Sequence, residues 1–314
     1  YHLGVMQWIV SGIAKAMRHA MRTSGAETLS CTANIFVGQT EAPLLVKPFI
    51  GKMTQSELMA VMTGGFATVA GGVLAIYVGM LRGMPGIAGH LVTASIMAAP
   101  AALAVAKLMF PETETSTTAG AVQVNVERPD ANAIEAVARG ATEGMGLLLN
   151  ICAMLIAFVG LMWMGNAILG VFGDILAWIG LSGAAGLSLQ KLLGWIMSPL
   201  AFGLGVPMDE ASHVGRLLGE KLVLTELIAY LGLKSLVSGT GAAILSTRSA
   251  VISSYALCGF ANIASIGIQI GGIGGMAPER RPDLARLGLR AMFAGALVSC
   301  LSAVWAGMIF QIFH

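Results

Sequence analysis

The sequence has few charged residues. Asp, Glu, Lys and Arg make up 11% of its 314 residues, and 56% are hydrophobic, whereas soluble domains carry about 25% charged residues. The mean hydropathy is +0.80. This composition excludes an ordinary soluble domain, and we predict an all-α, polytopic protein of the cell membrane, surrounded by the lipid bilayer. The net charge of +2 gives no support for nucleic-acid binding.

Cysteine is scarce, and common catalytic signatures are absent. The four cysteines stand singly in apolar segments without the CxxC spacing of a metal or redox site. We expect buried free thiols at Cys31, Cys152, Cys258 and Cys300. The sequence contains no GxSxG or HExxH motif, so an intramembrane hydrolase is only a minor alternative. We expect no enzyme activity and no cofactor apart from a coupling ion.

The sequence does have a polar segment between two apolar runs. Gly38, Gln39, Thr40 and Glu41 combine a flexible joint, an amide, a hydroxyl and a carboxylate, which are costly to bury in lipid without partners. This segment cuts the stretch 24–49 into halves shorter than the roughly 20 residues of a membrane span. We predict a re-entrant helical hairpin with its tip near Gly38, and an intramembrane carboxylate there indicates a functional site.

The chain opens within an apolar segment. Residues 3–14 resemble the end of a membrane helix, and they are followed by Lys15, Arg18 and Arg22, a basic cluster typical of a cytoplasmic edge. No initiator Met precedes Tyr1. We therefore expect further segments upstream of Tyr1.

A polar tract divides the chain. Residues 111–132, rich in Thr, Pro and acids, are predicted to form a loop between a first repeat at 1–110 and a second at 133–314. The second begins with an amphipathic segment, 134–146, expected to lie at the membrane interface. A long span at 147–176 follows it.

Each repeat is predicted to contain a hairpin and a broken span. Glycines bracket 66–70 within the span 55–80 and predict a helix unwound near its middle. A break at 205–207 predicts a second hairpin over 187–224, and the later span 248–275 reads FANIAS where the first reads FATVAG. Secondary transporters build mid-membrane sites from two such inverted repeats, because freed carbonyls bind a cation while side chains bind the solute. The remaining segments are 86–110, a short apolar piece at 226–233, a Gly/Ser-rich turn at 237–243, a basic loop at 278–286 and a last span at 287–313.

Four stretches resemble a known family. They read NIFVGQTEAPLLVKPF (34–49), MTGGFATVAGGV (62–73), ASIMAAPAALAVAKLMFPETE (94–114) and YALCGFANIASIGIQIGG (255–272). These long, ordered motifs resemble the concentrative nucleoside transporters, which are sodium-coupled nucleoside symporters, and the resemblance covers essentially the whole chain. Members have further helices before the point where this chain starts, and many read Asn-Glu-Phe where this chain has Thr225-Glu226-Leu227.

The resemblance implies a homotrimer in which a transport domain carries the site past a scaffold, as in an elevator. It also implies three sets of site residues. The nucleobase set is Gln39, Thr40, Glu41, Val73 and Phe260, and the ribose set is Glu226, Asn262 and Ser265. The sodium set is Asn34, Thr68 and the carbonyls of Val37 and Val69.

These residue types suit a nucleoside. The solute is neutral, with donors and acceptors on its base and hydroxyls on its sugar, so carboxylates, amides and hydroxyls fit it better than a cationic clamp. A buried carboxylate that accepts from hydroxyls discriminates strongly against analogues lacking them. Sodium prefers oxygen ligands, and a membrane potential adds roughly 2.3 kcal/mol per charge per 100 mV. We expect sodium-driven import of nucleosides such as uridine, cytidine and adenosine.

Several alternatives stay open. A proton carried by Glu41 or Glu226 can replace sodium, and an uncoupled facilitator or a channel also needs polar residues within the membrane. An isolated Gln, Thr or Ser in a membrane helix often only joins helices by hydrogen bonds. Glu226 can also form a structural ion pair with Lys221.

Overall fold

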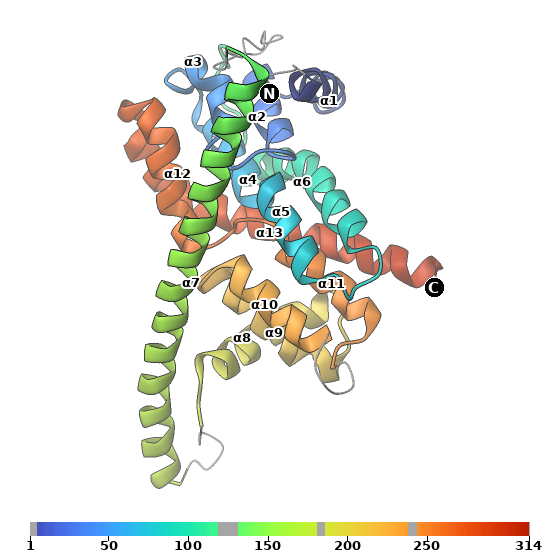
Figure 1. The fold of residues 1–314 in the computed structure, drawn as a ribbon, viewed down its shortest axis with the longest axis vertical. Helices are drawn as coiled ribbons and strands as arrows, with labels where there is room; N and C mark the ends of the chain where they lie inside the picture. The colour runs from blue at the N-terminus through green and yellow to red at the C-terminus, as the bar shows by residue number, and fades with distance from the viewer. Residues whose placement is uncertain (1–4, 119–130, 181–185, 238–243, 314) are drawn as a thin grey trace.

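The computed structural model describes residues 5–118, 131–180, 186–237 and 244–313, and every regular element in these ranges is a helix (Figure 1). Most of the predicted polar loop, 119–130, and most of the Gly/Ser-rich turn, 238–243, lie outside the described residues, as does Tyr1. In chain order the elements are α1 (Val5–Met21), α2 (Gly25–Ala33), η1 (Ala42–Val46), α3 (Lys47–Ile50), α4 (Gln55–Ala67), α5 (Gly71–Met80), α6 (Ile87–Met109), α7 (Ala133–Trp178), α8 (Leu189–Gly203), α9 (Met208–Val223), α10 (Glu226–Val237), α11 (Thr247–Leu257), α12 (Ile263–Met276), η3 (Pro278–Arg280) and α13 (Arg281–Phe313).

Four of the described helical segments are long and apolar enough to cross a bilayer. They are Gln55–Met80, Ile87–Met109, Val159–Trp178 and Pro278–Phe310. Each reaches the roughly 20 residues that a span requires. A fifth crossing results if the bent pair α8 and α9 is counted as one span. The prediction of an all-helical, multi-pass membrane protein is confirmed.

The first hairpin and both helix breaks lie where the sequence predicts them. α2 ends at Ala33, the chain passes irregularly through 34–41, and η1 and α3 return it. The first broken helix is α4 and α5, interrupted at 68–70, and the second is α11 and α12, interrupted at 258–262. Neither break contains a proline, so tertiary contacts must hold the backbone in these non-helical conformations.

The buried core has two parts, and the broken helices cross between them. One cluster is built around α2 and α4, the other around α5, α9, α10 and α11, and the long helices α6 and α13 contribute to both. α13 crosses between these two groups of helices in Figure 1. In the first broken helix, α4 packs in the cluster around α2 and α5 packs in the other cluster. In the second broken helix the order is reversed: α11 packs in the cluster around α9 and α10, and Ile273 of α12 packs in the cluster around α2 and α4. The two broken helices therefore run in opposite order through the core, and the inverted repeat itself stays a prediction.

α7 differs from its prediction. The sequence predicts an interfacial helix at 134–146 and a separate span at 147–176, but the structure has one continuous helix of 46 residues, about 69 Å long at 1.5 Å per residue. No proline interrupts it, and isolated glycines are tolerated within a helix.

α7 stands at the edge of the molecule (Figure 1), so Cys152 is exposed, contrary to prediction. Cys31 and Cys258 are buried, Cys300 is partly buried, and all four are free thiols.

Helices α8, α9 and α10 follow one another and are separated by two turns. At 205–207 the chain bends by 116° between α8 and α9, as predicted. These helices approach closely because α9 carries a glycine at the contact. A Cβ atom on Gly215 would lie 2.7 Å from the Ser198 nitrogen and 2.8 Å from the Gly194 carbonyl oxygen. A second turn at 224–225 separates α9 from α10, so Glu226 is the first residue of α10.

The Gly215→Ala substitution tests the close approach of α8 and α9. We expect it to lower the free energy of unfolding by about 1–3 kcal/mol, because backbone atoms of α8 cannot rotate away from the new methyl group. Gly203→Ala is the matched control, since a Cβ there meets nothing within 4 Å. Thermal unfolding of the detergent-solubilised protein measures both, and equal melting temperatures for the two variants would contradict the contact.

Candidate functional site

The two helix breaks lie against each other and against the first hairpin. The Phe260 N–H donates to the Thr68 carbonyl at 3.3 Å, which joins the second break to the first. The Gly71 N–H, at the start of α5, donates to the Phe36 carbonyl in the hairpin at 3.0 Å. Three segments that are distant in the sequence therefore meet at one place, which is where transporters with broken helices bind their substrates.

The Glu226 carboxylate is buried at this meeting point. Its side chain accepts two hydrogen bonds, from the Tyr77 hydroxyl to Oε1 at 2.9 Å and from Asn262 Nδ2 to Oε2 at 2.8 Å. Glu226 is only 6% exposed, and a buried carboxylate without donors is strongly unfavourable. Because Tyr77 belongs to α5 and Asn262 immediately precedes α12, the carboxylate links the second halves of both broken helices.

Asn262 is oriented by the helix that it caps. Its Oδ1 accepts from the Ser265 N–H at 2.8 Å, as expected of an N-cap residue. This bond turns the amide nitrogen toward Glu226. The N-terminus of α12 carries partial positive charge, so it also favours an anionic or hydrogen-bond-accepting group at this position.

A chain of polar side chains continues from Ser265 into the first hairpin. Gln39 Nε2 donates to Ser265 Oγ at 3.4 Å, and Gln39 Oε1 accepts from Gln269 Nε2 at 3.1 Å. Gln269 Nε2 also donates to the Met62 carbonyl of α4 at 3.1 Å, while its Oε1 is buried without a partner. We call the full set the polar chain: Tyr77, Glu226, Asn262, Ser265, Gln39 and Gln269.

The other residues implied for nucleobase contact lie outside the polar chain. Thr40 lies against α12, where its Cγ2 atom would meet a Cβ on Gly272. The Glu41 side chain is exposed and folds back over the hairpin tip. Val73 is buried in the second core cluster, and the partly buried Phe260 packs against that cluster.

Unpaired oxygen atoms lie in the first hairpin beside the first break. Asn34 Oδ1 and Ser30 Oγ are both buried, and neither has a hydrogen-bond partner among the described residues. Asn34 Nδ2 donates to the Ser30 carbonyl at 3.1 Å, which leaves Oδ1 available. Thr68 is buried at the end of α4, and its hydroxyl donates to the Gly64 carbonyl at 2.9 Å, so its oxygen lone pairs can still accept or coordinate.

The carbonyls implied as further sodium ligands are also unpaired. No donor in the described part of the chain bonds to the Val37 or Val69 carbonyl. Such a set of neutral oxygen atoms fits a small, hard monovalent cation. Among the described residues, no three His, Cys, Asp or Glu side chains gather as they would around a transition metal.

Sequence reasoning missed three of these residues. Gln269 was detectable, because in the segment 263–276 only Ser265 and Gln269 have polar side chains, and a buried amide requires hydrogen-bond partners. Tyr77 and Ser30 gave no local signal. The hydrogen-bond partner of Tyr77 is 149 residues away in the chain. Ser30 stands out only in the structure, where its Oγ is buried without a hydrogen-bond partner among the described residues.

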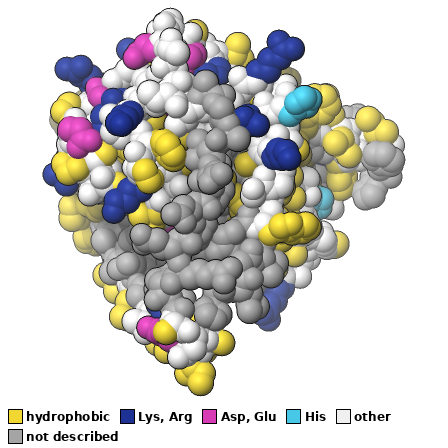
Figure 2. Space-filling view, turned by 90° about the horizontal axis from the view of Figure 1, so that it is seen from above, with side chains coloured by type: hydrophobic (Ala, Val, Ile, Leu, Met, Phe, Trp, Pro, Cys, Tyr) yellow, Lys and Arg dark blue, Asp and Glu magenta, His cyan; other side chains and the backbone are white. Residues whose placement is uncertain are grey.

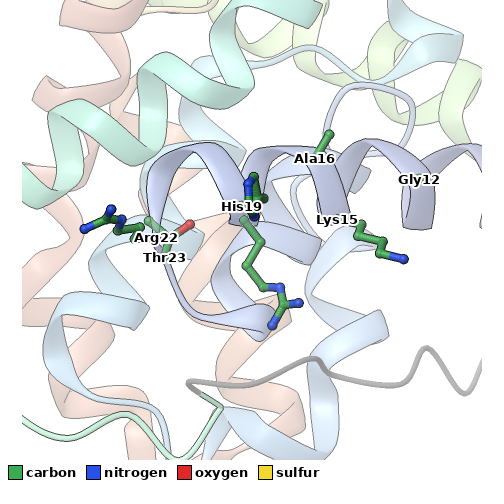
Figure 3. Close-up of a pocket in the computed structure, with 7 residues that line it drawn as sticks. Gly12, Lys15, Ala16, His19, Arg22 and Thr23 are labelled. Atoms are coloured by element: carbon green, nitrogen blue, oxygen red, sulfur yellow. The ribbon is translucent and has the colours of Figure 1, made fainter.

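The hollow in Figure 3 is separate from the polar chain. It is lined by Gly12, Lys15, Ala16, Arg18, His19, Arg22 and Thr23. The sequence predicts that a helix ends before Lys15, but α1 continues to Met21, so most of these basic side chains share one helix. Figure 2 looks onto the end of the molecule from which α1 starts and shows Lys and Arg side chains around its rim. That the basic cluster marks a membrane edge stays a prediction.

Comparison with known proteins identifies the family. Residues 90–307 match the family model described as Na+ dependent nucleoside transporter C-terminus, and residues 1–84 match a model described as nucleoside recognition. An uncharacterized transporter of Haemophilus influenzae is 48% identical over 309 residues, covering 98% of this chain and 72% of that protein. Sodium/nucleoside cotransporter 1 of Homo sapiens is 42% identical over 323 residues, covering 99% of this chain and 48% of that protein. This chain therefore spans about half of the human cotransporter.

Solved structures agree with this match. The structure of CNTnw in an inward-facing, substrate-bound state is 45% identical, with a TM-score of 0.89, covering 99% of this chain and 71% of that one. An intermediate state of a CNTnw variant is 46% identical, with a TM-score of 0.91 and coverage of 99% and 72%. Since the matching family and relatives are transporters, the hydrolase alternative falls away. The chain belongs to the family of sodium-dependent nucleoside transporters.

Proposed function

We propose that this protein imports nucleosides by symport with sodium, through an alternating-access cycle of the elevator type. The observation that carries the proposal is the polar chain, which lies where the two broken helices cross and next to the unpaired oxygens of the first hairpin. Relatives in Homo sapiens and Mus musculus are named sodium/nucleoside cotransporters. Related solved structures are described as inward-facing, intermediate and outward-facing, which supports alternating access.

The ribose would bind at the Glu226 end of the polar chain. Tyr77 and Asn262 hold the carboxylate in place, and ribose hydroxyls would donate to its remaining lone pairs. Ser265 would offer a further hydroxyl. Charge-assisted hydrogen bonds of this kind are about twice as strong as neutral ones, so the hydroxylated sugar would be the main recognition element.

The nucleobase would bind at the hairpin end. The Gln39 amide offers a donor and an acceptor to the edge of the base, and Thr40 and Glu41 would add a hydroxyl and a carboxylate. Val73 and Phe260 would supply apolar contacts to the flat ring. The bonds that Gln39 now makes to Ser265 and Gln269 would be exchanged for bonds to the base.

Sodium would bind between the first hairpin and the first break. Asn34 and the Val37 carbonyl come from the hairpin, whereas Thr68 and the Val69 carbonyl come from the break. An ion that takes ligands from both segments would fix the hairpin in position, and with it Gln39. This gives a physical reason for coupling, because the nucleoside would meet a preorganised site only after sodium has bound.

A homotrimeric assembly is part of the proposal. α7 is the most exposed of the candidate spans, with 6% of its membrane window buried in the chain. Its exposed apolar side chains include Trp163, Ile168 and Phe172. A scaffold helix of this kind would be covered by lipid and by other copies, while the two core clusters move relative to it.

Uptake of radiolabelled uridine into proteoliposomes tests the function, and Thr68→Val tests the ion site in the same assay. We expect accumulation with an inward sodium gradient and none with a proton gradient alone. Thr68→Val should raise the half-saturating sodium concentration about tenfold, which corresponds to 1.4 kcal/mol, because one oxygen ligand is lost. Thr63→Val is the matched control, since Thr63 is buried on the same helix and also donates to the carbonyl four residues before it, at 2.7 Å.

Each contrary outcome has a distinct meaning. Equilibration without accumulation would identify a facilitator and contradict symport. Accumulation driven by protons alone would contradict sodium coupling. Equal sodium dependence of the Thr68→Val and Thr63→Val variants would remove Thr68 from the ion site.

Glu226→Gln tests the ribose assignment. A neutral amide cannot replace the charged acceptor, so uridine binding should weaken by about 10- to 100-fold, in line with 1.5–3 kcal/mol for a hydrogen bond to a charged group. Binding of 2′,3′-dideoxyuridine should change much less. Glu220→Gln is the matched control, because Glu220 is a buried carboxylate on the neighbouring helix α9 and interacts with Arg216 at 3.8 Å.

Calorimetric titration of the purified variants measures both affinities. The assignment requires that the ratio between uridine and dideoxyuridine binding shrinks in Glu226→Gln alone. A ratio that is the same in Glu226→Gln and in the unmodified protein would place the ribose elsewhere.

A further inference from the structure

One side of α1 carries positive charge that the proposed transport mechanism leaves unused. Lys15, His19 and Arg22 are exposed, and Arg18 is partly exposed. In the part of the chain that the structure describes, no acidic side chain forms an ion pair with any of them. Together they line the hollow of Figure 3, which has a volume of about 800 Å³. This volume is within the range of ligand-binding pockets.

The spacing of these residues places them on one face of the helix. Lys15, His19 and Arg22 are four and three residues apart, so they follow one another along α1 and the turn after it (Figure 3). Trp8 lies seven residues before Lys15 on the same face and is 79% exposed. The opposite face, which includes Ala14, packs in the first core cluster. The basic face is therefore free of the helix packing that holds α1 in place.

Helix polarity explains only part of this cluster. The C-terminus of a helix carries partial negative charge and favours basic residues in the last turn, where Arg18 and His19 lie. Lys15 lies more than one turn before the end of α1. Lys15 and Arg18 are also neighbours on the helix surface, so their like charges repel each other. An anion between them would remove this repulsion.

Arg22 has a backbone conformation that does not favour arginine. Its φ is +55°, and among the residues that the structure describes it alone has a positive φ without being glycine. Its N–H donates to the Arg18 carbonyl at 2.9 Å, which is the bond of an αL helix cap. Glycine is usual at such a cap, because a Cβ atom is crowded there. An arginine that is kept at a strained position indicates a role for its side chain.

We propose that this hollow binds the phosphate group of an anionic phospholipid. Lysine and arginine donate charge-assisted hydrogen bonds to phosphate oxygens, and arginine can bind two oxygens at once. Basic clusters next to apolar membrane helices attract anionic lipids. Trp8 lies about 10 Å from Lys15 along the helix axis, where its indole ring would contact the glycerol and acyl region of the same lipid. The proposal does not depend on which solute or ion the protein transports.

The hollow adjoins the first hairpin. Thr23 lines it, and the Thr23 hydroxyl is hydrogen-bonded to the Thr28 hydroxyl of α2 at 2.7 Å. The Thr32 hydroxyl of α2 donates to the sulfur of Met17 in α1 at 3.4 Å. A lipid that holds the turn between α1 and α2 would therefore stabilise this arm of the hairpin, and its binding should raise the melting temperature.

Lipid binding to the detergent-solubilised protein, measured by native mass spectrometry, tests the proposal. Dioleoylphosphatidylglycerol should bind about tenfold or more tightly than the zwitterionic dioleoylphosphatidylcholine, because it alone carries net negative charge. The double variant Lys15→Gln/Arg22→Gln should lose this preference. Arg82→Gln/Lys234→Gln is the matched control, since it removes the same charge from exposed positions outside the hollow, and it should keep the preference.

The contrary outcomes are specific. Equal affinity for the two lipids would overturn the proposal, and this is also the result expected if another segment or copy covers the hollow. An equal loss of preference in both double variants would overturn it too, because net charge alone would then explain the binding. Inorganic phosphate at millimolar concentration should leave most of the phosphatidylglycerol bound. Complete displacement by phosphate would assign the hollow to the free anion and overturn the lipid assignment.

Arg22→Gly keeps the test decisive if the double variant does not fold. Glycine adopts a φ of +55° without strain, so this variant should melt at the same temperature as the unmodified protein or higher when no lipid is added. The rise in melting temperature on adding phosphatidylglycerol should be smaller than in the unmodified protein, because one phosphate ligand is lost. A rise as large as that of the unmodified protein would contradict the role of Arg22.

Discussion

Lipid offers no hydrogen-bond partner to a backbone group, so each broken helix creates carbonyl and N–H groups that the protein must satisfy itself. In this structure, backbone groups of one interrupted segment form hydrogen bonds with those of another. The Phe260 N–H reaches the Thr68 carbonyl, and the Gly71 N–H reaches the Phe36 carbonyl, so each break is held by another interrupted segment. The breaks therefore lie together, and the polar side chains that flank them form one site.

The charges in this region follow the same constraint. The Glu226 carboxylate has donors from both broken helices, and the Lys221 ammonium has acceptors at the end of α11. What remains unpaired in the first hairpin is a set of neutral oxygens, chiefly Asn34 Oδ1 and Ser30 Oγ. In the proposed function these oxygens would coordinate sodium, while Glu226 would accept from the hydroxyls of the nucleoside.

The sequence predicted the features that have local causes. The interruption near Gly38 and the break before Gly71 are marked by polar residues and glycines within apolar runs, and the helices do end there; that the first hairpin is re-entrant stays a prediction. The position of Asn262 at the second break was suggested by its match to Thr68 in the repeat, whereas its expected role came from the family resemblance. The continuity of α7 through 134–176 was missed, because an amphipathic start does not by itself end a helix. Tyr77 was missed because its partner is distant in the chain, and no local pattern reports such a contact.

The central claim is that an ion at the first break and a nucleoside at the polar chain bind as one coupled system. The most direct measurement is the dissociation constant of uridine at increasing sodium concentrations, together with the dissociation constant of sodium at increasing uridine concentrations, in the purified protein. Linkage requires that each ligand strengthens the other by the same factor, and the account predicts a factor of about 10 or more, equal in both directions. A uridine dissociation constant that does not change with sodium would contradict the account.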